Sequence, residues 1–442
     1  MNFVDEVTGK NVLIFGLGLQ GGGLGDAEWL VEHGARVRAT DQKTSKQLES
    51  SLRKLPTTVS LSLGGHKMSD IDWADIIIKN PGVPDNSEFI KYAKSSGKPV
   101  YTSIALVVKA APSKVIGITG TRGKSTTTEL IYALLSRSHP GKVKKGGNVP
   151  GTSGLRLLDE LENLDYLVLE LSSFQLHSFH DLEISPHIAV VTNLYPDHLN
   201  RYDSMEEYFF DKSALTRYQT PGDLCIAFSG NAGSQSLSSL SPGKVIEYAP
   251  SDVPSTWTTP LRGAHNQENI AATLAIAREL RLDEGMVKDV VEGFATLSFR
   301  LETVGQVMGI QYVNDTTSTT PVATIKAVES LANPTTLILG GDTKNLPTDE
   351  LVSSLANSRF VEKIVLLGCK NIPKFVSELR SACQAKIVGQ VDSMDQAVAL
   401  ATAVSKPGWT VLLSPGFASF DLFANEFDRG RQFNECIHKL SE

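Results

Sequence analysis

The chain has 442 residues, which is too many for one hydrophobic core, so several domains are expected. Its hydrophobic content of 41% and charged content of 21% are close to globular averages and exclude the collagenous, low-complexity and disordered classes. A net charge of −7 argues against a partner with a phosphate backbone, so no nucleic-acid binding is expected.

The sequence shows no targeting or membrane signal. Its apolar runs have the length of strands, which predicts no membrane insertion. The first residues lack a basic patch followed by an apolar stretch, so we expect no secretory signal and a cytoplasmic location. The cysteines are scattered without a CxxC pair, and we expect reduced thiols at Cys225, Cys369, Cys383 and Cys436.

Residues 1–100 alternate short β-branched runs with amphipathic segments of helix length, a pattern typical of parallel α/β units. We expect strands at residues 11–15, 35–40, 59–63 and 75–79, and helices at residues 26–32 and 88–95.

Two further stretches repeat this alternation, so the chain is predicted to be an α/β protein of three domains, at residues 1–100, 101–299 and 300–442. In the second domain we expect strands at 115–119, 166–171 and 188–193, and helices at 126–135, 206–218 and 266–280. In the third we expect strands at 335–339, 363–367 and 410–413, and helices at 348–357, 373–383 and 394–404. The Ser- and Gly-rich residues 229–243 are expected to form a surface loop or a small excursion.

The strongest local motif is a glycine-punctuated turn between an apolar strand and a helix, Val115-Ile-Gly-Ile-Thr-Gly120-Thr-Arg-Gly-Lys124-Ser125-Thr126. Glycines let backbone N–H groups point into one concavity, and the helix N-terminus adds positive potential, which suits a phosphate group. Lys124 would reach the terminal phosphates, and the Ser125 hydroxyl would bind Mg²⁺. Ile118 stands where the longer form of the motif has its first glycine, so the match is to the shorter Gly-x-x-Gly-Lys-Ser form. The motif predicts an ATP site.

A second glycine-rich turn, Gly16-Leu-Gly18-Leu-Gln-Gly21, follows the first predicted strand, and Asp41 closes the next strand. This is the pattern of a dinucleotide fingerprint, but backbone N–H groups bind any diphosphate. A nicotinamide-dependent oxidoreductase therefore stays open at this point. Asn80-Pro-Gly82-Val closes another strand, at the edge where α/β sheets usually bind ligands.

Polar side chains also follow two predicted strands of the middle domain. Glu170-Leu-Ser172-Ser-Phe-Gln175 ends one strand, Asn193-Leu-Tyr-Pro-Asp-His198 ends the next, and Lys212 follows on a predicted helix. Magnesium takes oxygen ligands and keeps several waters, so one carboxylate such as Glu170 together with substrate phosphates makes a normal site.

Taken in order, these motifs resemble those of the Mur ligases over nearly the whole chain. The matching blocks are Gly120-Thr-Arg-Gly-Lys-Ser-Thr, Glu170-Leu-Ser-Ser-Phe-Gln-Leu, Asn193…Asp197-His-Leu-Asn-Arg-Tyr202, Gly263-Ala-His-Asn-Gln-Glu-Asn269, Arg300-Leu-Glu302, Asn314-Asp315 and Ser419-Phe-Asp-Leu-Phe423. The second and the last most resemble the glutamate-adding members of the family.

The resemblance implies a Rossmann-like N-terminal domain for UDP, a central P-loop ATPase-type domain, and a Rossmann-like C-terminal domain for glutamate. It implies ATP-dependent joining of glutamate to UDP-N-acetylmuramoyl-L-alanine, with two Mg²⁺ ions, and a monomer is expected. Lys124, His198 and Lys212 would be catalytic. A protonated lysine repels a cation, and the family's answer is an N-carbamylated lysine, here Lys212, whose new carboxylate binds the metal.

The resemblance also implies which residues bind each ligand. For the UDP substrate these are Gly18, Leu19, Gln20, Asp41, Asn80, Gly82, Asn148, Ser172 and Gln175. For ATP they are Gly120, Thr121, Arg122, Gly123, Lys124, Ser125, Thr126, Asn266, Asn269, Arg300 and Asp315. For glutamate they are Thr317, Thr319, Lys344, Ser419 and Phe420, and for the metals Ser125, Glu170, His198 and carbamylated Lys212.

The sequence departs from the family pattern at two places near the amino-acid site. Thr317 stands where the usual D-glutamate enzyme has a lysine, and Leu297-Ser-Phe replaces Leu-Pro-His. A threonine donates a hydrogen bond but carries no charge, so an L-glutamate-adding variant is a second hypothesis beside D-glutamate.

Three further classes remain as rivals. Folylpolyglutamate synthase shares the ATP chemistry, but it does not need the N-terminal glycine turn. An oxidoreductase would leave Lys124, Glu170 and His198 unexplained. A catalytically dead regulator would not need the phosphate and metal residues that the chain retains.

Overall fold

The computed structural model describes residues 3–18, 21–148, 153–197, 201–261, 263–294, 298–342, 346–369, 372–419, 422–423 and 425–441. The chain divides into two compact units. The first holds Met1–Asp197, Ser204–Trp257 and His265–Val291, and the second holds His198–Asp203, Thr258–Ala264 and Glu292–Glu442.

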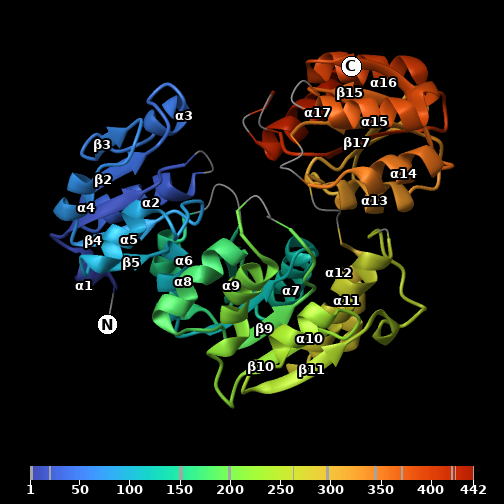
Figure 1. The fold of residues 1–442 in the computed structure, drawn as a ribbon. Helices are drawn as coiled ribbons and strands as arrows, with labels where there is room; N and C mark the ends of the chain where they lie inside the picture. The colour runs from blue at the N-terminus through green and yellow to red at the C-terminus, as the bar shows by residue number, and fades with distance from the viewer. Residues whose placement is uncertain are drawn as a thin grey trace. The chain divides into compact units, whose positions relative to one another are not determined.

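The first unit begins with a five-stranded parallel sheet in the order β3-β2-β1-β4-β5 (Figure 1). Its strands are β1 Asn11–Phe15, β2 Arg36–Asp41, β3 Ser60–Leu63, β4 Ile76–Lys79 and β5 Val100–Tyr101. The helices of this part are α1 Phe3–Val7, α2 Gly22–Glu32, α3 Glu49–Leu52, α4 Met68–Trp73, α5 Glu88–Ser95 and α6 Ser103–Ala110. Alternate side chains of β1 enter two separate cores, Val12 and Ile14 with α2, and Leu13 and Phe15 with α4 and α5.

The same unit continues with a six-stranded parallel sheet in the order β11-β10-β9-β6-β8-β7. Its strands are β6 Lys114–Thr119, β7 Val143–Gly147, β8 Tyr166–Glu170, β9 Ile188–Val191, β10 Leu224–Phe228 and β11 Lys244–Tyr248. Its α-helices are α7 Lys124–Ser138, α8 Ser173–Leu182, α9 Met205–Arg217, α10 Ala232–Ser238, α11 Ala264–Glu279 and α12 Glu284–Glu292. Two 3-10 segments, η1 Leu155–Asn163 and η2 Pro250–Asp252, complete this part.

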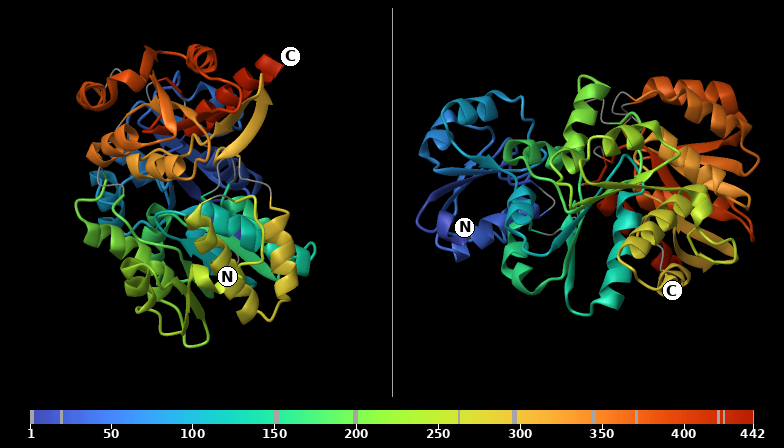
Figure 2. Two further views of the ribbon diagram at one scale, coloured as in Figure 1. Left: turned by 90° about the vertical axis from the view of Figure 1, so that its right-hand side faces the viewer. Right: turned by 90° about the horizontal axis from the view of Figure 1, so that it is seen from below.

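Helices cover both faces of this central sheet (Figures 1 and 2). Apolar side chains of α7 and α11 pack on one face, and those of α6, α8 and α9 pack on the other. Two layers of helix on a parallel sheet bury the strands from both sides, which explains their continuous apolar runs. The carboxyl ends of β6, β8 and β9 therefore meet at one edge, where the phosphate loop begins.

The second unit contains a six-stranded sheet in the order β12-β13-β17-β14-β15-β16. Its strands are β12 Glu302–Val307, β13 Ile310–Asn314, β14 Thr335–Gly340, β15 Val361–Leu367, β16 Ile387–Val391 and β17 Thr410–Gly416. Its helices are α13 Pro321–Glu329, α14 Asp349–Asn357, α15 Pro373–Cys383, η3 Gln384–Lys386, α16 Met394–Val404 and α17 Glu426–Ser441. Strand β12 is antiparallel to β13, whereas the other pairs are parallel.

Every strand and helix expected from the sequence is present, with ends shifted by up to a few residues. Residues 229–243 were expected to form a surface loop or a small excursion. The surface-loop alternative is wrong, because they contain helix α10 between β10 and β11, with Leu237 fully buried. The antiparallel strand β12 was also not foreseen. The four cysteines are free thiols, as predicted, and the structure places all four in buried positions.

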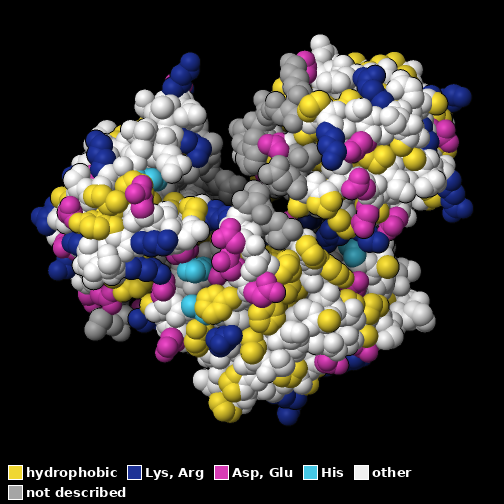
Figure 3. All heavy atoms as spheres, viewed as in Figure 1, with side chains coloured by type: hydrophobic (Ala, Val, Ile, Leu, Met, Phe, Trp, Pro, Cys, Tyr) yellow, Lys and Arg dark blue, Asp and Glu magenta, His cyan; other side chains and the backbone are white. Residues whose placement is uncertain are grey.

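The surface and the helices agree with an ordinary globular composition. On the face shown in Figure 3, Lys and Arg side chains are interspersed with Asp and Glu over the described part of the chain. Among the described helices, none is both long and apolar enough to cross a lipid bilayer.

Candidate functional site

The phosphate loop lies between β6 and α7 and takes its shape from two glycines. Gly120 has φ 153° and Gly123 has φ 81°, both in the region that glycine favours. A Cβ built on Gly120 would lie 1.8 Å from Thr192 Oγ1, and one on Gly123 would lie 2.4 Å from Asn269 Oδ1. The glycines are required by backbone conformation and by close approach at once.

The end of the neighbouring strand β9 holds this loop in place. Thr121 N–H donates to the backbone oxygen of Asn193 at 2.8 Å, and Arg122 N–H donates to its side-chain Oδ1 at 2.9 Å. Thr192 Oγ1 lies 2.6 Å from Arg122 O. Asn193 begins one of the polar strand-end segments singled out from the sequence, but no role was predicted for it or for Thr192. The available signal was a polar residue directly after a buried strand, since burial of such a group requires a hydrogen-bond partner.

Two lysines converge on the loop. Lys124 Nζ donates to Gly120 O at 3.0 Å and to Thr121 O at 3.1 Å. Lys212, on α9, reaches the same Gly120 oxygen at 3.0 Å and lies 3.3 Å from Thr119 Oγ1. Burial, and next the charge of Lys124, lower the pKa of Lys212 well below its ordinary value of 10.5. The structure thus brings both predicted catalytic lysines to one carbonyl of the phosphate loop, whereas His198 lies outside the described residues.

Glu170 ends β8, beside the strand that leads into the loop. Ile118 and Glu170 are partners in the parallel pairing of β6 with β8. The Glu170 carboxylate is buried and accepts a hydrogen bond from Asn148 Nδ2 at 3.0 Å, while Asn148 N–H donates to Glu170 O at 2.8 Å. Gly147 permits this approach, because a Cβ there would lie 2.1 Å from Glu170 O.

These residues fit a magnesium ion in donor chemistry. A buried carboxylate fixed by an amide, together with the Ser125 hydroxyl in the first turn of α7, offers the oxygen ligands that Mg²⁺ prefers. Among the described residues, no three His, Cys, Asp or Glu side chains form a metal-binding cluster. A site with one carboxylate that completes its shell with water and phosphate needs no such cluster.

The two asparagines expected at the adenine also lie against the phosphate loop. Asn269 Nδ2 donates to Asn266 Oδ1 at 2.9 Å, and Thr127 Oγ1 donates to Asn269 Oδ1 at 3.1 Å. Both asparagines are buried on α11, and Thr127 belongs to α7, as does Thr126, which is also buried. The contact with α7 fixes the Asn269 side chain next to Gly123.

The residues expected at the UDP moiety gather at the carboxyl edge of the N-terminal sheet. Gly18 N–H donates to Asp41 Oδ2 at 2.9 Å, and Gly82 N–H donates to Asn80 Oδ1 at 2.8 Å. A Cβ built on Gly18 would lie 3.1 Å from Asn80 Nδ2, so the two turns touch. Leu19 and Gln20 lie outside the described residues.

Ser172 and Gln175, expected at the muramoyl part of the substrate, form the capping box of α8. Ser172 Oγ accepts from Gln175 N–H at 3.3 Å, and Gln175 Oε1 accepts from Ser172 N–H at 3.0 Å. The two side chains therefore fix the start of this helix.

The remaining predicted residues belong to the second unit. Asp315 is buried, accepts hydrogen bonds from Ser414 Oγ at 2.8 Å and Leu301 N–H at 3.2 Å, and has its pKa raised to about 6 by burial. Thr317 Oγ1 donates to Phe299 O at 2.8 Å, and Thr319 N–H donates to Thr317 O at 2.9 Å. Arg300 is exposed, whereas Ser419 is buried. Lys344 and Phe420 lie outside the described residues.

The chain contains three sheets in an α/β architecture. A phosphate loop, two lysines and the hydrogen-bonded carboxylate of Glu170 lie at one edge of the second sheet. This arrangement is typical of an enzyme that uses a nucleoside triphosphate. Three family models match the chain in order. They are the Mur ligase MurD-like N-terminal domain at residues 10–102, the Mur ligase middle domain at residues 118–252, and the Mur ligase glutamate ligase domain at residues 299–417. The chain belongs to the Mur ligase family.

Curated relatives match the chain from end to end. UDP-N-acetylmuramoylalanine–D-glutamate ligases of Roseiflexus sp. and Borreliella burgdorferi are each 34% identical over 99% of this chain, and cover 100% and 99% of their own lengths. The ligase of the same name from Clostridioides difficile is 32% identical over 98% of this chain and 100% of its own.

Solved structures of the family share the fold. UDP-N-acetylmuramate–alanine ligase of Thermotoga maritima has a TM-score of 0.63 at 18% identity. The match covers 98% of this chain and 100% of the ligase. The MurF ligase of the same organism, determined in complex with ADP, has a TM-score of 0.61 at 16% identity, covering 100% of this chain and 97% of its own.

Proposed function

We propose that this chain is an ATP-dependent ligase that joins D-glutamate to UDP-N-acetylmuramoyl-L-alanine in the synthesis of peptidoglycan precursors. The observation that carries the proposal is the convergence of Lys124 and Lys212 on the phosphate loop beside Glu170, in a chain that matches D-glutamate ligases over its full length. The match of residues 10–102 to a MurD-like N-terminal domain disfavours both the oxidoreductase and folylpolyglutamate synthase.

The reaction needs an activated carboxyl group, because a carboxylate has a poor leaving group and its charge repels nucleophiles. The alanyl carboxylate oxygen attacks the γ-phosphorus of ATP, and the bond to the β-phosphate oxygen breaks to release ADP. The glutamate amine then attacks the carbon of the resulting acyl phosphate, loses a proton, and phosphate leaves. Lys124 and the backbone amides of the loop offset the negative charge that spreads over the phosphoryl oxygens.

Ser125 and Glu170 would hold one magnesium ion, and His198 and carbamylated Lys212 the second, and the ions would supply further positive charge to the phosphates. Support for the carbamate comes from the lowered pKa of Lys212, because a neutral amine is the form that adds carbon dioxide. The amine nitrogen bonds the carbon of CO₂ and one proton is released, so a lysine becomes an anionic oxygen ligand.

The other roles remain as the resemblance implies. Gly18, Leu19, Gln20, Asp41, Asn80 and Gly82 would meet the UDP moiety. Asn148 would touch the substrate or phosphate, and Ser172 and Gln175 would contact the muramoyl part. Asn266, Asn269, Arg300 and Asp315 would bind ATP, and Thr317, Thr319, Lys344, Ser419 and Phe420 would bind glutamate. We place the domain boundaries at 1–100, 101–299 and 300–442 and the reaction in the cytoplasm, with the enzyme acting as a monomer.

One assay decides the substrate. The purified chain is incubated with ATP, Mg²⁺, UDP-N-acetylmuramoyl-L-alanine and either glutamate enantiomer, and both phosphate release and the ligated product are measured. Product with D-glutamate supports the proposal, whereas product with L-glutamate alone identifies the L-glutamate-adding variant suggested by Thr317. Product without ATP consumption, or full turnover by Lys124→Ala, refutes the mechanism.

A further inference from the structure

The turn that follows β4 is folded around a buried lysine. Lys79 is the last residue of the strand, and its ammonium group is almost fully buried, with its side chain 1% exposed. Its Nζ donates to Val83 O at 3.2 Å and pairs with the carboxylate of Asp85. A buried ammonium group needs such partners, so its presence fixes the path of residues 80–85. This is the turn that carries Asn80 and Gly82.

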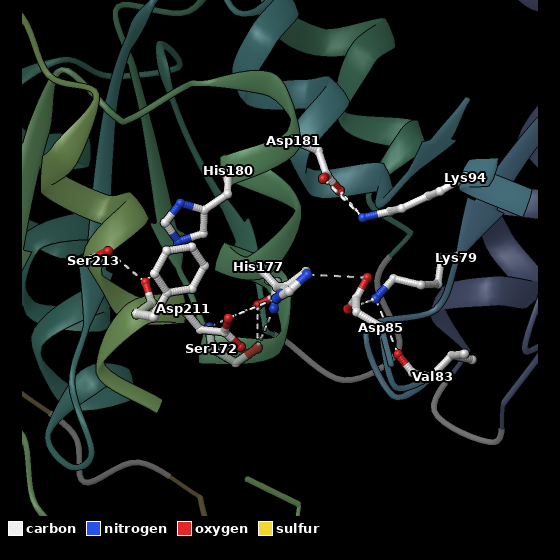
Figure 4. Close-up of polar contacts among 12 residues, drawn as sticks. Lys79, Val83, Asp85, Lys94, Ser172, His177, His180, Asp181, Asp211 and Ser213 are labelled. Atoms are coloured by element: carbon white, nitrogen blue, oxygen red, sulfur yellow. Dashed lines mark hydrogen bonds and ion pairs between the residues drawn. The ribbon is translucent and has the colours of Figure 1, made fainter. Parts of the chain in front are cut away.

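The other oxygen of Asp85 faces the central part of the same unit (Figure 4). His177 Nε2, on α8, lies 3.5 Å from Asp85 Oδ1, and His177 Nδ1 lies 2.8 Å from Asp211 Oδ1 on α9. Burial by itself lowers the pKa of His177, but the hydrogen bond to Asp211 and the charges of both carboxylates outweigh it, so its pKa is raised. With both ring nitrogens facing carboxylates, the imidazolium form suits the site, because only that form has two N–H groups.

The row of contacts ends on α9, the helix whose next residue reaches the phosphate loop. Asp211 directly precedes Lys212, and Lys212 Nζ lies 3.0 Å from Gly120 O. Charges of alternating sign therefore run without a break from Lys79 to Asp211, from the end of one sheet to the helix that carries a catalytic lysine of the other. We call Lys79, Asp85, His177 and Asp211 the charge relay.

We propose that the charge relay positions the 80–85 turn against helix α9, and so places the carboxyl end of a UDP-linked substrate at the phosphoryl group. This inference rests on the proposed function and names positioning residues for it. The geometric requirement is strict, since a misplacement of about 1 Å at a reacting centre lowers the rate about 100-fold. A single flexible contact would not meet this requirement. Asp85 and His177 each contact two charged groups, so neither side chain can move without breaking a second interaction.

A second ion pair between the same parts provides a matched control. Lys94 on α5 and Asp181 on α8 pair at 2.9 Å, with side chains 39% and 37% exposed (Figure 4). Among the described residues, neither side chain forms a hydrogen bond or an ion pair with the 80–85 turn or with α9. Exposed pairs of this kind contribute little. Asp181→Asn thus removes an ion pair between the N-terminal and central parts of the unit and leaves the residues of the charge relay unchanged.

The test compares Asp85→Asn, His177→Gln, their double variant and Asp181→Asn in the full chain. We expect the first two to raise KM for UDP-N-acetylmuramoyl-L-alanine and lower kcat, each about tenfold, with KM for ATP unchanged. The double variant should be no worse than either single one, because both break the same relay. Asp181→Asn should stay within about twofold of the parent. A KM for the UDP substrate unchanged in Asp85→Asn, or additive effects in the double variant, would overturn the proposal.

Hydrogen exchange separates this proposal from the proposed function. His177→Gln should speed hydrogen exchange at the four amides of the 80–85 turn, those of Asn80, Gly82, Val83 and Asp85, whereas Asp181→Asn should leave it unchanged. A parent chain that forms no product refutes the ligase function, and the exchange result still decides whether the charge relay orders the turn. Unchanged exchange in His177→Gln overturns the relay even in an active enzyme. Urea titration of each variant confirms that the comparison is made on folded protein.

Discussion

Gly123→Ala should damage both the stability of the phosphate loop and its affinity for ATP. Gly123 has φ 81° and directly precedes α7, and a Cβ there would lie 2.4 Å from Asn269 Oδ1. Asn269 cannot simply rotate away, because its side chain bonds both Thr127 and Asn266. The substitution therefore changes the backbone conformation and the contact between α7 and α11 together.

The magnitude follows from two contributions. A non-glycine residue in a left-handed conformation costs roughly 1–2 kcal/mol. Displacing Asn269 sacrifices two buried hydrogen bonds, each contributing about 1 kcal/mol. Gly141→Ala isolates the first contribution, since Gly141 has φ 74° and nothing within 4 Å of a built Cβ. We expect Gly123→Ala to be less stable than Gly141→Ala by about 2 kcal/mol.

The free energies of unfolding come from urea titration of the parent and both variants, and ATP affinity comes from calorimetry with a non-hydrolysable analogue. Asn269 is proposed to hold the adenine, so Gly123→Ala should weaken binding about tenfold or more, equivalent to about 1.4 kcal/mol. Gly141→Ala should bind as the parent does. Equal stability of the two variants, with parental affinity in both, would refute the reasoning.

Three further outcomes are expected. Burial raises the pKa of Asp315 to about 6 from its ordinary 3.8. The native state therefore keeps the Asp315 proton at pH values where the unfolded chain has already lost it. The stability that this residue contributes falls by about 3 kcal/mol as pH rises from about 4 to 6. In urea titrations, the free energy of unfolding of Asp315→Asn should increase relative to that of the parent by that amount between pH 4 and pH 7. A difference that does not change with pH would contradict the raised pKa. Gly147→Ala should cost roughly 3 kcal/mol, because its Cβ meets backbone at Glu170, while Gly97→Ala, with similar backbone strain in open space, should cost roughly 1 kcal/mol in the same assay. Lys212→Ala should lose ligase activity and partly regain it with added short-chain carboxylic acids, and the absence of any rescue would count against the carbamate.

The phosphate loop shows how far local sequence reaches. Its glycines, Lys124 and the apolar strand before them are close together in the chain, so their spacing predicts the turn, the helix and the anion site. The sequence singled out Asn193 at a strand end but not its role in holding the phosphate loop. That role depends on β9 lying beside β6, a pairing between segments about 70 residues apart, as the Arg122–Asn193 contact shows. Helix α10 was not predicted for the same reason. Its polar, Ser-rich sequence resembles a loop, and what stabilises the helix is the packing of Leu237 against α9 and the sheet.

Periodicity and motif order by themselves determined the α/β class, the three sheets, the family and the residues expected at each ligand, because those signals are carried by neighbours in the chain. Only the tertiary structure decided which side chains share charge. Lys79, Asp85, His177 and Asp211 come from a strand, a turn and two helices, and nothing in their spacing indicates contact. Which charged groups interact depends on their distance in space and on their burial. Both are set by the packing of the sheets and helices in the tertiary structure.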